Sequence, residues 1–149
     1  MAAFARKRAG DIQGAKRICQ DGLDRFGDDW LWTAQFHDEL YRIAVQEEDW
    51  HKAILHLQAQ AEEFRLRPQS VKPYNICINN LQFAECYDKL CDSPSVRQHS
   101  VKCWKSAKES EDEGLKSLSL KRLAKLTTFA PISSQDRLMV CIQFSISAL

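Results

Sequence analysis

The sequence predicts an all-α fold built from helical hairpins, on three observations. Only 5 of the 149 residues are glycine and 4 are proline, whereas an all-β domain needs many tight turns and is richer in both. Apolar residues recur at three- and four-residue intervals along most of the chain, which is the spacing of one helical face. A turn followed by a helix also occurs twice with matching residues, at 10–26 and 48–64.

Residues 4–26 are expected to form the end of one helix, a turn at residues 9–11, and a second helix. Two glycines inside that second helix, Gly14 and Gly22, each cost about 1 kcal/mol relative to alanine, so we expect them where a neighbouring helix approaches closely. Gly27 supplies the stop at the end of the helix. The apolar stripe of this helix consists of Ile12, Ala15, Ile18, Cys19 and Leu23.

The next pair of helices has the clearest pattern. Acidic residues at 47–49 form the predicted turn between them. Pro68 ends the pair, because proline cannot continue a helix and biases the residue before it away from helical geometry. The first apolar stripe consists of Trp32, Phe36, Leu40, Ile43 and Ala44, and the second of Trp50, Ala53, Ile54, Leu57, Ala61 and Phe64.

A third pair is predicted to start after Pro73 and to break at residues 92–95, with a longer loop around Pro94. Its second helix is expected at residues 96–109 and is followed by a charged hinge at 109–114. The break is predicted because serine, aspartate and proline cluster there and favour a turn.

A fourth pair begins at Leu115 and is cut short at Pro131. We therefore expect one helical-repeat domain at residues 1–130 and an uncertain apolar tail at 131–149, which fits either a closing helix or an unstructured end. Because the pattern starts in mid-hairpin, the sequence fits a truncated array or isoform, and equally a short complete protein.

The repeat is best seen by overlaying two segments. Residues 10–15 and 48–53 match as a turn, an acidic residue, an apolar residue, two spacers and an alanine. The two alanines, Ala15 and Ala53, are 38 residues apart. After each alanine follow an inner-face residue, a small residue and a phenylalanine, which are Ile18, Gly22 and Phe26 in one copy and Leu57, Ala61 and Phe64 in the other.

This pattern resembles the tetratricopeptide repeat over roughly residues 4–126. Leu40 and Ala53 stand where that family packs its two helices, and Trp50 stands at its turn aromatic. Two features depart from the family pattern: Tyr41 takes the place of the usual glycine, and the spacing exceeds the usual period of about 34 residues. The resemblance implies a right-handed α–α superhelix, a solenoid of about three helical hairpins.

The same resemblance implies a non-catalytic scaffold or adaptor that binds a peptide or helix of a partner within a multiprotein complex. An alternative is the half-a-tetratricopeptide repeat of RNA-processing factors, whose first helices are rich in aromatic residues. Trp30, Trp32 and Phe36 keep that alternative open.

Six residues are predicted to contact the partner. Lys102, Lys105 and Lys108 recur at three-residue spacing on one helix, and such a basic face suits an acidic peptide, because charge complementarity sets orientation and association rate. The alternative for these lysines is an ordinary solvated face. The resemblance adds the groove contacts Arg42, Lys72 and Asn79, since first helices line the groove and asparagine can hold a ligand's backbone.

Catalytic, metal and cofactor sites are not expected. The sequence has no glycine-rich phosphate loop, nucleophile elbow or zinc-protease motif. His51 and His56 are five residues apart, so they point in different directions on a helix. The acidic pairs stand at predicted turns and helix starts, where carboxylates favour the helix dipole.

Bulk properties narrow the partners and the compartment. With 21 basic and 20 acidic residues, the net charge of +1 makes nucleic acid an unlikely partner. No apolar run reaches the roughly 18 residues that a membrane span needs. The six cysteines are scattered irregularly, which is typical of free thiols in a reducing compartment. We therefore expect an intracellular, cytoplasmic protein, with the nucleus as an alternative.

Overall fold

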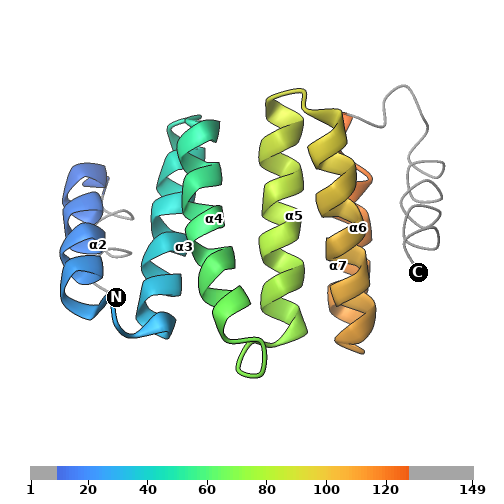
Figure 1. The fold of residues 1–149 in the computed structure, drawn as a ribbon. Coiled ribbons are helices and arrows are strands. Elements are labelled where there is room, and N and C mark those ends of the chain that lie inside the picture. The colour runs from blue at the N-terminus through green and yellow to red at the C-terminus, as the bar shows by residue number, and fades with distance from the viewer. Residues whose placement is uncertain (1–9, 128–149) are drawn as a thin grey trace. The chain divides into compact units, whose positions relative to one another are not determined.

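The computed structural model describes residues 10–127. Within that range it contains six α-helices and no strand (Figure 1), so the predicted all-helical class is confirmed there. The predictions for residues 1–9 and for the apolar tail at 131–149 lie outside the described residues. The helices are α2 (Ile12–Phe26), α3 (Trp30–Gln46), α4 (Trp50–Leu66), α5 (Pro73–Lys89), α6 (Ser93–Glu109) and α7 (Glu113–Leu123).

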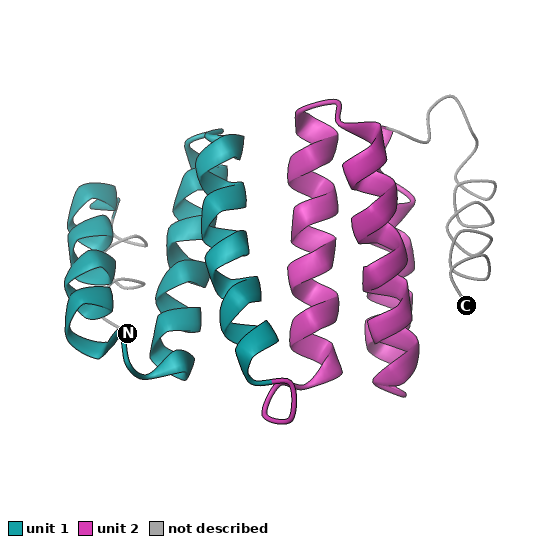
Figure 2. Cartoon of the chain, in the orientation of Figure 1, with its two compact units in different colours: residues 1–67 teal, residues 68–149 magenta. Residues whose placement is uncertain are grey.

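The chain divides after Arg67 into two compact units (Figure 2). In the first, which we call unit 1, α2 packs against α3 and α3 packs against α4. In the second, unit 2, α5 packs against α6, and α7 packs against both. Each unit therefore buries its apolar stripes between helices that are neighbours in sequence. None of the helices within residues 10–127 combines the length and the hydropathy required to cross a bilayer.

One short turn recurs before four of the six helices. In each copy a residue in the left-handed conformation is followed by an aspartate that caps the next helix. The left-handed residues are Gly10, Glu48, Cys91 and Glu111, with φ of 83°, 58°, 58° and 57°. The aspartates are Asp11, Asp49, Asp92 and Asp112, whose carboxylates accept the N–H of Gly14, Lys52, Ser95 and Leu115 at 2.8, 3.0, 3.2 and 3.0 Å.

This turn satisfies the backbone groups of two helix ends at once. Between α3 and α4, the N–H of Asp49 donates to the carbonyl of Ala44 at 2.9 Å, and the N–H of Glu48 donates to Val45 at 3.1 Å. These bonds occupy carbonyls that the end of α3 would leave open, while the Asp49 side chain occupies an open N–H of α4. The overlay of residues 10–15 on 48–53 is thus confirmed as a shared geometry.

The predicted break between α5 and α6 exists, but it lies at 90–92 and not at 92–95, and the longer loop predicted around Pro94 is wrong. The turn at Cys91 and Asp92 is as short as the others, and α6 begins at Ser93. Pro94 lies in the first turn of α6, where its missing N–H costs nothing because that group would have no partner inside the helix. The charged hinge at 109–114 is also shorter than expected, since α6 extends to Glu109 and α7 begins at Glu113.

Burial supports the repeat but corrects one of its positions. Ala15 and Ala53 are both fully buried, and Val96 takes the same place in α6. Four residues after Ala15 and Ala53 stand Cys19 and Leu57, which are also fully buried. The pairing of Ile18 with Leu57 is therefore wrong: Cys19 packs with Leu40 in the buried cluster, whereas Ile18 is only partly buried beside it.

Gly22 has the expected role of allowing a neighbouring helix to come close. A Cβ at this position would overlap the ring of Phe36, which lies on α3. Gly14 does not have this role, because its Cβ would meet the carboxylate of Asp11, the cap of its own helix. Gly27 caps α2 with a φ of −59°, so it does not use the left-handed conformation.

The left-handed residues give a first prediction. Glu48→Gly should raise the free energy of unfolding by about 0.5–1 kcal/mol, since the relief of left-handed strain exceeds the extra unfolded-state entropy of glycine. Glu47→Gly, whose φ of −84° is favourable for any residue, should instead destabilise the protein. Urea denaturation of both variants measures the difference, and equal destabilisation would contradict the strain at Glu48.

Two leucines of α4 give a second prediction. Leu57 is fully buried, whereas Leu55 is 63% exposed. Leu57→Ala should lower the free energy of unfolding by about 2–5 kcal/mol, because it leaves a cavity. Leu55→Ala should change it by less than about 0.5 kcal/mol. Comparable losses in urea denaturation would mean that the inner face of α4 is misassigned.

Candidate partner-binding surfaces

The outward face of α6 is the strongest of the predicted partner contacts. Lys102 and Lys105 are exposed and Lys108 is half-buried. Glu109 is the only acidic residue of the helix, and within residues 10–127 none of the three lysines forms an ion pair. The opposite face of α6 carries the buried residues Val96, Ser100, Cys103 and Ala107, so the lysines lie on the side that faces solvent.

The other three predicted contacts do not share a helix face with the lysines of α6. Arg42 is exposed on α3, where its Nε donates to Asp38 Oδ2 at 2.9 Å. Lys72 is exposed at the N-cap position of α5. Asn79 is only 3% exposed, which leaves little of its side chain for a partner. Arg42 belongs to unit 1 and the other five residues to unit 2, where only the three lysines share a helix face.

Two cations of α7, Arg122 and Lys116, are already paired with carboxylates. Arg122 of α7 forms a bidentate ion pair with Glu85 of α5, with Nε–Oε1 and Nη2–Oε2 distances of 2.7 Å. Lys116 donates to Glu113 at 2.7 Å. Both charges are thus already matched, and Lys121 and Lys125 are the exposed cations left near this end.

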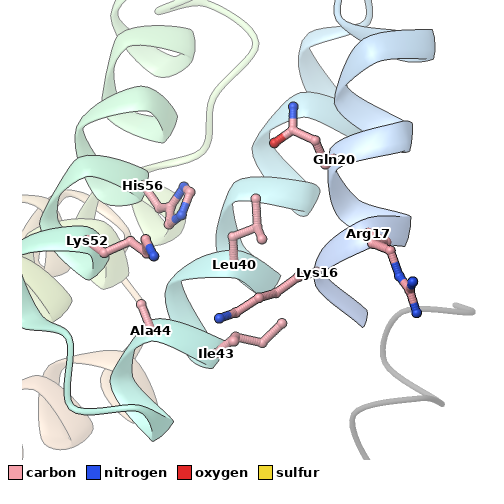
Figure 3. Close-up of a pocket in the computed structure, with 8 residues that line it drawn as sticks. All are labelled: Lys16, Arg17, Gln20, Leu40, Ile43, Ala44, Lys52 and His56. Atoms are coloured by element: carbon pink, nitrogen blue, oxygen red, sulfur yellow. The ribbon is translucent and has the colours of Figure 1, made fainter. Parts of the chain in front are cut away.

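A groove on unit 1 was not anticipated from the sequence (Figure 3). It has a volume of about 310 Å³. Its floor consists of Leu40, Ile43 and Ala44 of α3, which are buried. Lys16 and Lys52 point into it from α2 and α4, and no acidic residue among the described residues 10–127 lines it. The remaining lining residues are Arg17, Gln20 and His56.

Sequence reasoning missed this groove because its cations lie on helices far apart in the chain, while its floor residues have the pattern of an ordinary core. One signal was present in the overlay. Lys16 directly follows Ala15 and Lys52 directly precedes Ala53, so two equivalent helices each carry a cation beside the matched alanine. Only the packing of α2 and α4 against α3 brings these cations to one groove.

Two histidines of unit 1 meet between α3 and α4. The Nδ1 atoms of His37 and His56 are 3.2 Å apart. Burial lowers the pKa of His37, although Glu63 opposes the shift. Burial is the main cause that lowers the pKa of His56 to about 4, and the nearby His37 and Lys52 lower it further. Both rings are therefore neutral at pH 7, and one N–H can donate to the other ring.

A third histidine, His99 of α6, has a structural environment in unit 2. Its ring stacks on Phe83 with centroids 4.4 Å apart and on Tyr87 at 5.5 Å. Its Nδ1 lies 2.9 Å from Asn80 Oδ1. Burial, with a smaller contribution from Lys102, lowers the pKa of His99 to about 4. These contacts join α5 to α6.

The cysteines and acidic residues of the described chain do not gather into a metal site. No group of three or more histidine, cysteine, aspartate or glutamate side chains within residues 10–127 could hold a metal ion. Cys77 and Cys103 do lie close together, with a Sγ–Sγ distance of 3.6 Å, and Ser119 Oγ is 3.2 Å from Cys77 Sγ.

Comparisons with protein-family models, with curated proteins and with solved structures found nothing that matches this chain.

The half-buried histidine His56 predicts a specific pH dependence. Below its ordinary pKa of 6.5, His56 takes up a proton in the unfolded chain, whereas in the folded chain it does so only near pH 4. Between those values the unfolded state binds more protons, so stability should fall as the pH falls from 6.5 to 4.

Replacing His56 should reduce this pH dependence. In urea denaturation across that pH range, His56→Gln should show a shallower loss of stability than the unmodified protein. His51→Gln is the matched control for the loss of one histidine, since His51 is an exposed histidine of the same helix. An unchanged slope in His56→Gln would show that His56 has the same pKa in the folded and the unfolded chain.

Proposed function

We propose that this chain is a non-catalytic, tetratricopeptide-like adaptor that binds an acidic peptide or helix of a partner protein. The proposal includes a right-handed superhelix of about three hairpins as its architecture. Its support is the recurrence of one turn before α2, α4, α6 and α7, together with the packing of sequence neighbours within each unit. Such hairpins bury only part of their surface alone, so they stack and leave extended faces for binding.

The single observation that carries the choice of partner is the lysine face of α6. Lys102 and Lys105 are exposed, Lys108 is adjacent, and none of them is matched by an acidic side chain in the described chain. Unpaired cations of this kind add little to folding stability. They attract an acidic segment over a distance of about 8–10 Å at moderate salt, and they orient it on the helix.

The groove of unit 1 supplies a second surface for the same class of partner. An acidic segment with one large apolar side chain matches its buried floor and its two inward-pointing lysines. Lys16 is already paired with Glu47 at 2.6 Å, while Lys52 lies 3.8 Å from Asp49. Because the Asp49 carboxylate also caps α4, Lys52 is the cation more available to a partner.

Binding by these surfaces is passive. The helices hold the cations in place and no bond is made or broken. Exposed lysines at such a surface act mainly on the association rate, so affinity should decrease as salt is added. The runner-up function, binding to RNA in an RNA-processing factor, draws on the same cations and would show a steep salt dependence of its own.

A paired charge reversal tests the proposal. Lys102→Glu/Lys105→Glu removes the basic face of α6, and Lys121→Glu/Lys125→Glu makes the same charge change elsewhere in unit 2. The probes are a displayed library of random peptides and a single-stranded oligouridine RNA. We expect the unmodified protein to select peptides rich in aspartate and glutamate, with at least a tenfold loss of affinity in the first variant and little loss in the second.

Other outcomes of this experiment are informative in different ways. Selection of peptides without acidic enrichment would contradict the proposed partner chemistry. Salt-dependent binding of oligouridine with no selected peptide would favour the RNA-binding alternative. Equal losses in the two variants would show that only net charge matters and that the face of α6 is not the site.

A further inference from the structure

The buried thiols of unit 2 are the part of the molecule that the proposed function does not use. Cys77 of α5, Cys103 of α6 and Ser119 of α7 are all 0% exposed. They form one chain of contacts, with Cys77 Sγ 3.6 Å from Cys103 Sγ and 3.2 Å from Ser119 Oγ. Three helices thus bring one hydroxyl and two thiols together at the centre of the unit.

We propose that Cys77 and Cys103 form an oxidation site, at which a peroxide converts the two thiols into a disulfide that joins α5 to α6. The inference does not rest on the proposed adaptor function. It rests on the contact between the two sulfur atoms and on their placement on facing positions of two packed helices. The other buried cysteines of the described chain are Cys19 and Cys86.

The surroundings assign different roles to the two sulfurs. The hydrogen bond from Cys103 lowers the pKa of Cys77 to about 7, against the effect of burial, and Ser119 and Arg122 add to the lowering. The same hydrogen bond, together with burial, raises the pKa of Cys103. Cys77 is therefore the sulfur that loses its proton first, and the thiolate is the nucleophilic form of cysteine.

The reaction proceeds in two steps that balance. The Cys77 thiolate attacks one oxygen of hydrogen peroxide, the O–O bond breaks, and Cys77 becomes a sulfenic acid while hydroxide leaves and takes up the proton that Cys77 had released. Cys103 then attacks the Cys77 sulfur, the S–O bond breaks, and the Cys103 proton leaves with the hydroxyl as water. In total, two thiols and one peroxide give one disulfide and two waters.

Access to the pair requires local opening, since neither sulfur reaches the surface. α7 carries Ser119 and, with 11 residues, is the shortest of the described helices. Local opening costs less free energy than global unfolding, and hydrogen peroxide is small enough to enter through a modest opening. The opening step should therefore make the reaction slower than oxidation of a surface thiol.

The test uses the full chain, treated with hydrogen peroxide and analysed by peptide mapping under non-reducing conditions. We expect a linked pair of peptides containing Cys77 and Cys103, at peroxide levels that leave Cys19 and Cys86 reduced. The exposed Cys91 serves as an internal indicator that the oxidant is active. Reduction with dithiothreitol should restore both thiols.

Two variants and one solvent condition sharpen the result. Cys103→Ser should abolish the link and leave oxidised Cys77, whereas Cys86→Ser, a buried cysteine of the same α5 helix, should leave the link intact. In denaturing urea the preference for the Cys77–Cys103 link should disappear, because the native contact is lost.

The proposal would be overturned if Cys91 became oxidised while Cys77 and Cys103 stayed reduced. It would also be overturned if the same link formed with equal preference in denaturing urea, since the native arrangement of α5 and α6 would then have no part in it.

Discussion

The structure depends on one local constraint, the need to satisfy the open backbone groups at the ends of successive helices within a few residues. A left-handed residue followed by aspartate meets this need, because it closes the last carbonyls of one helix and the first amides of the next. Such a short connection forces the two helices to run back along each other. Their apolar stripes then meet by default, as they do for α3 with α4 and for α5 with α6.

Within each unit, polar contacts between helices fix their relative positions more specifically than the apolar stripes alone would. In unit 2, Glu85 of α5 forms an ion pair with Arg122 of α7. Asp88 accepts hydrogen bonds from the N–H and the Oγ1 hydroxyl of Thr127 at 3.0 and 2.9 Å. In unit 1, Gln60 donates to the carbonyl of Ala34 at 3.2 Å between α4 and α3. The pair with Glu85 also offsets the charge that Arg122 would present to a partner.

The titratable groups that resemble catalytic residues by type have packing roles at these same helix contacts. His37 meets His56 between α3 and α4, and His99 stacks on the aromatic rings of α5. Cys77 and Cys103 meet between α5 and α6. Burial shifts the pKa values of the histidines toward the neutral form, so each ring can be buried without a counter-charge.

The sequence by itself determined the helices and the repeat, because both follow from local rules. Apolar spacing, an aspartate at a helix start and a residue that tolerates a turn are properties of neighbouring residues, and they located the equivalence of Ala15 with Ala53. Where sequence reasoning failed, one local rule was given too much weight: proline was taken to break the chain at Pro94, although a first-turn proline starts α6 without cost.

Only the tertiary structure decided which side chains meet. The partners of Arg122, the pairing of Cys77 with Cys103, and the groove made by Lys16 and Lys52 join residues separated by dozens of positions. An apolar stripe about 100° wide can face the core in several rotations of the helix about its own axis. The rotation adopted depends on how the facing helices interlock, and no short stretch of sequence contains that information.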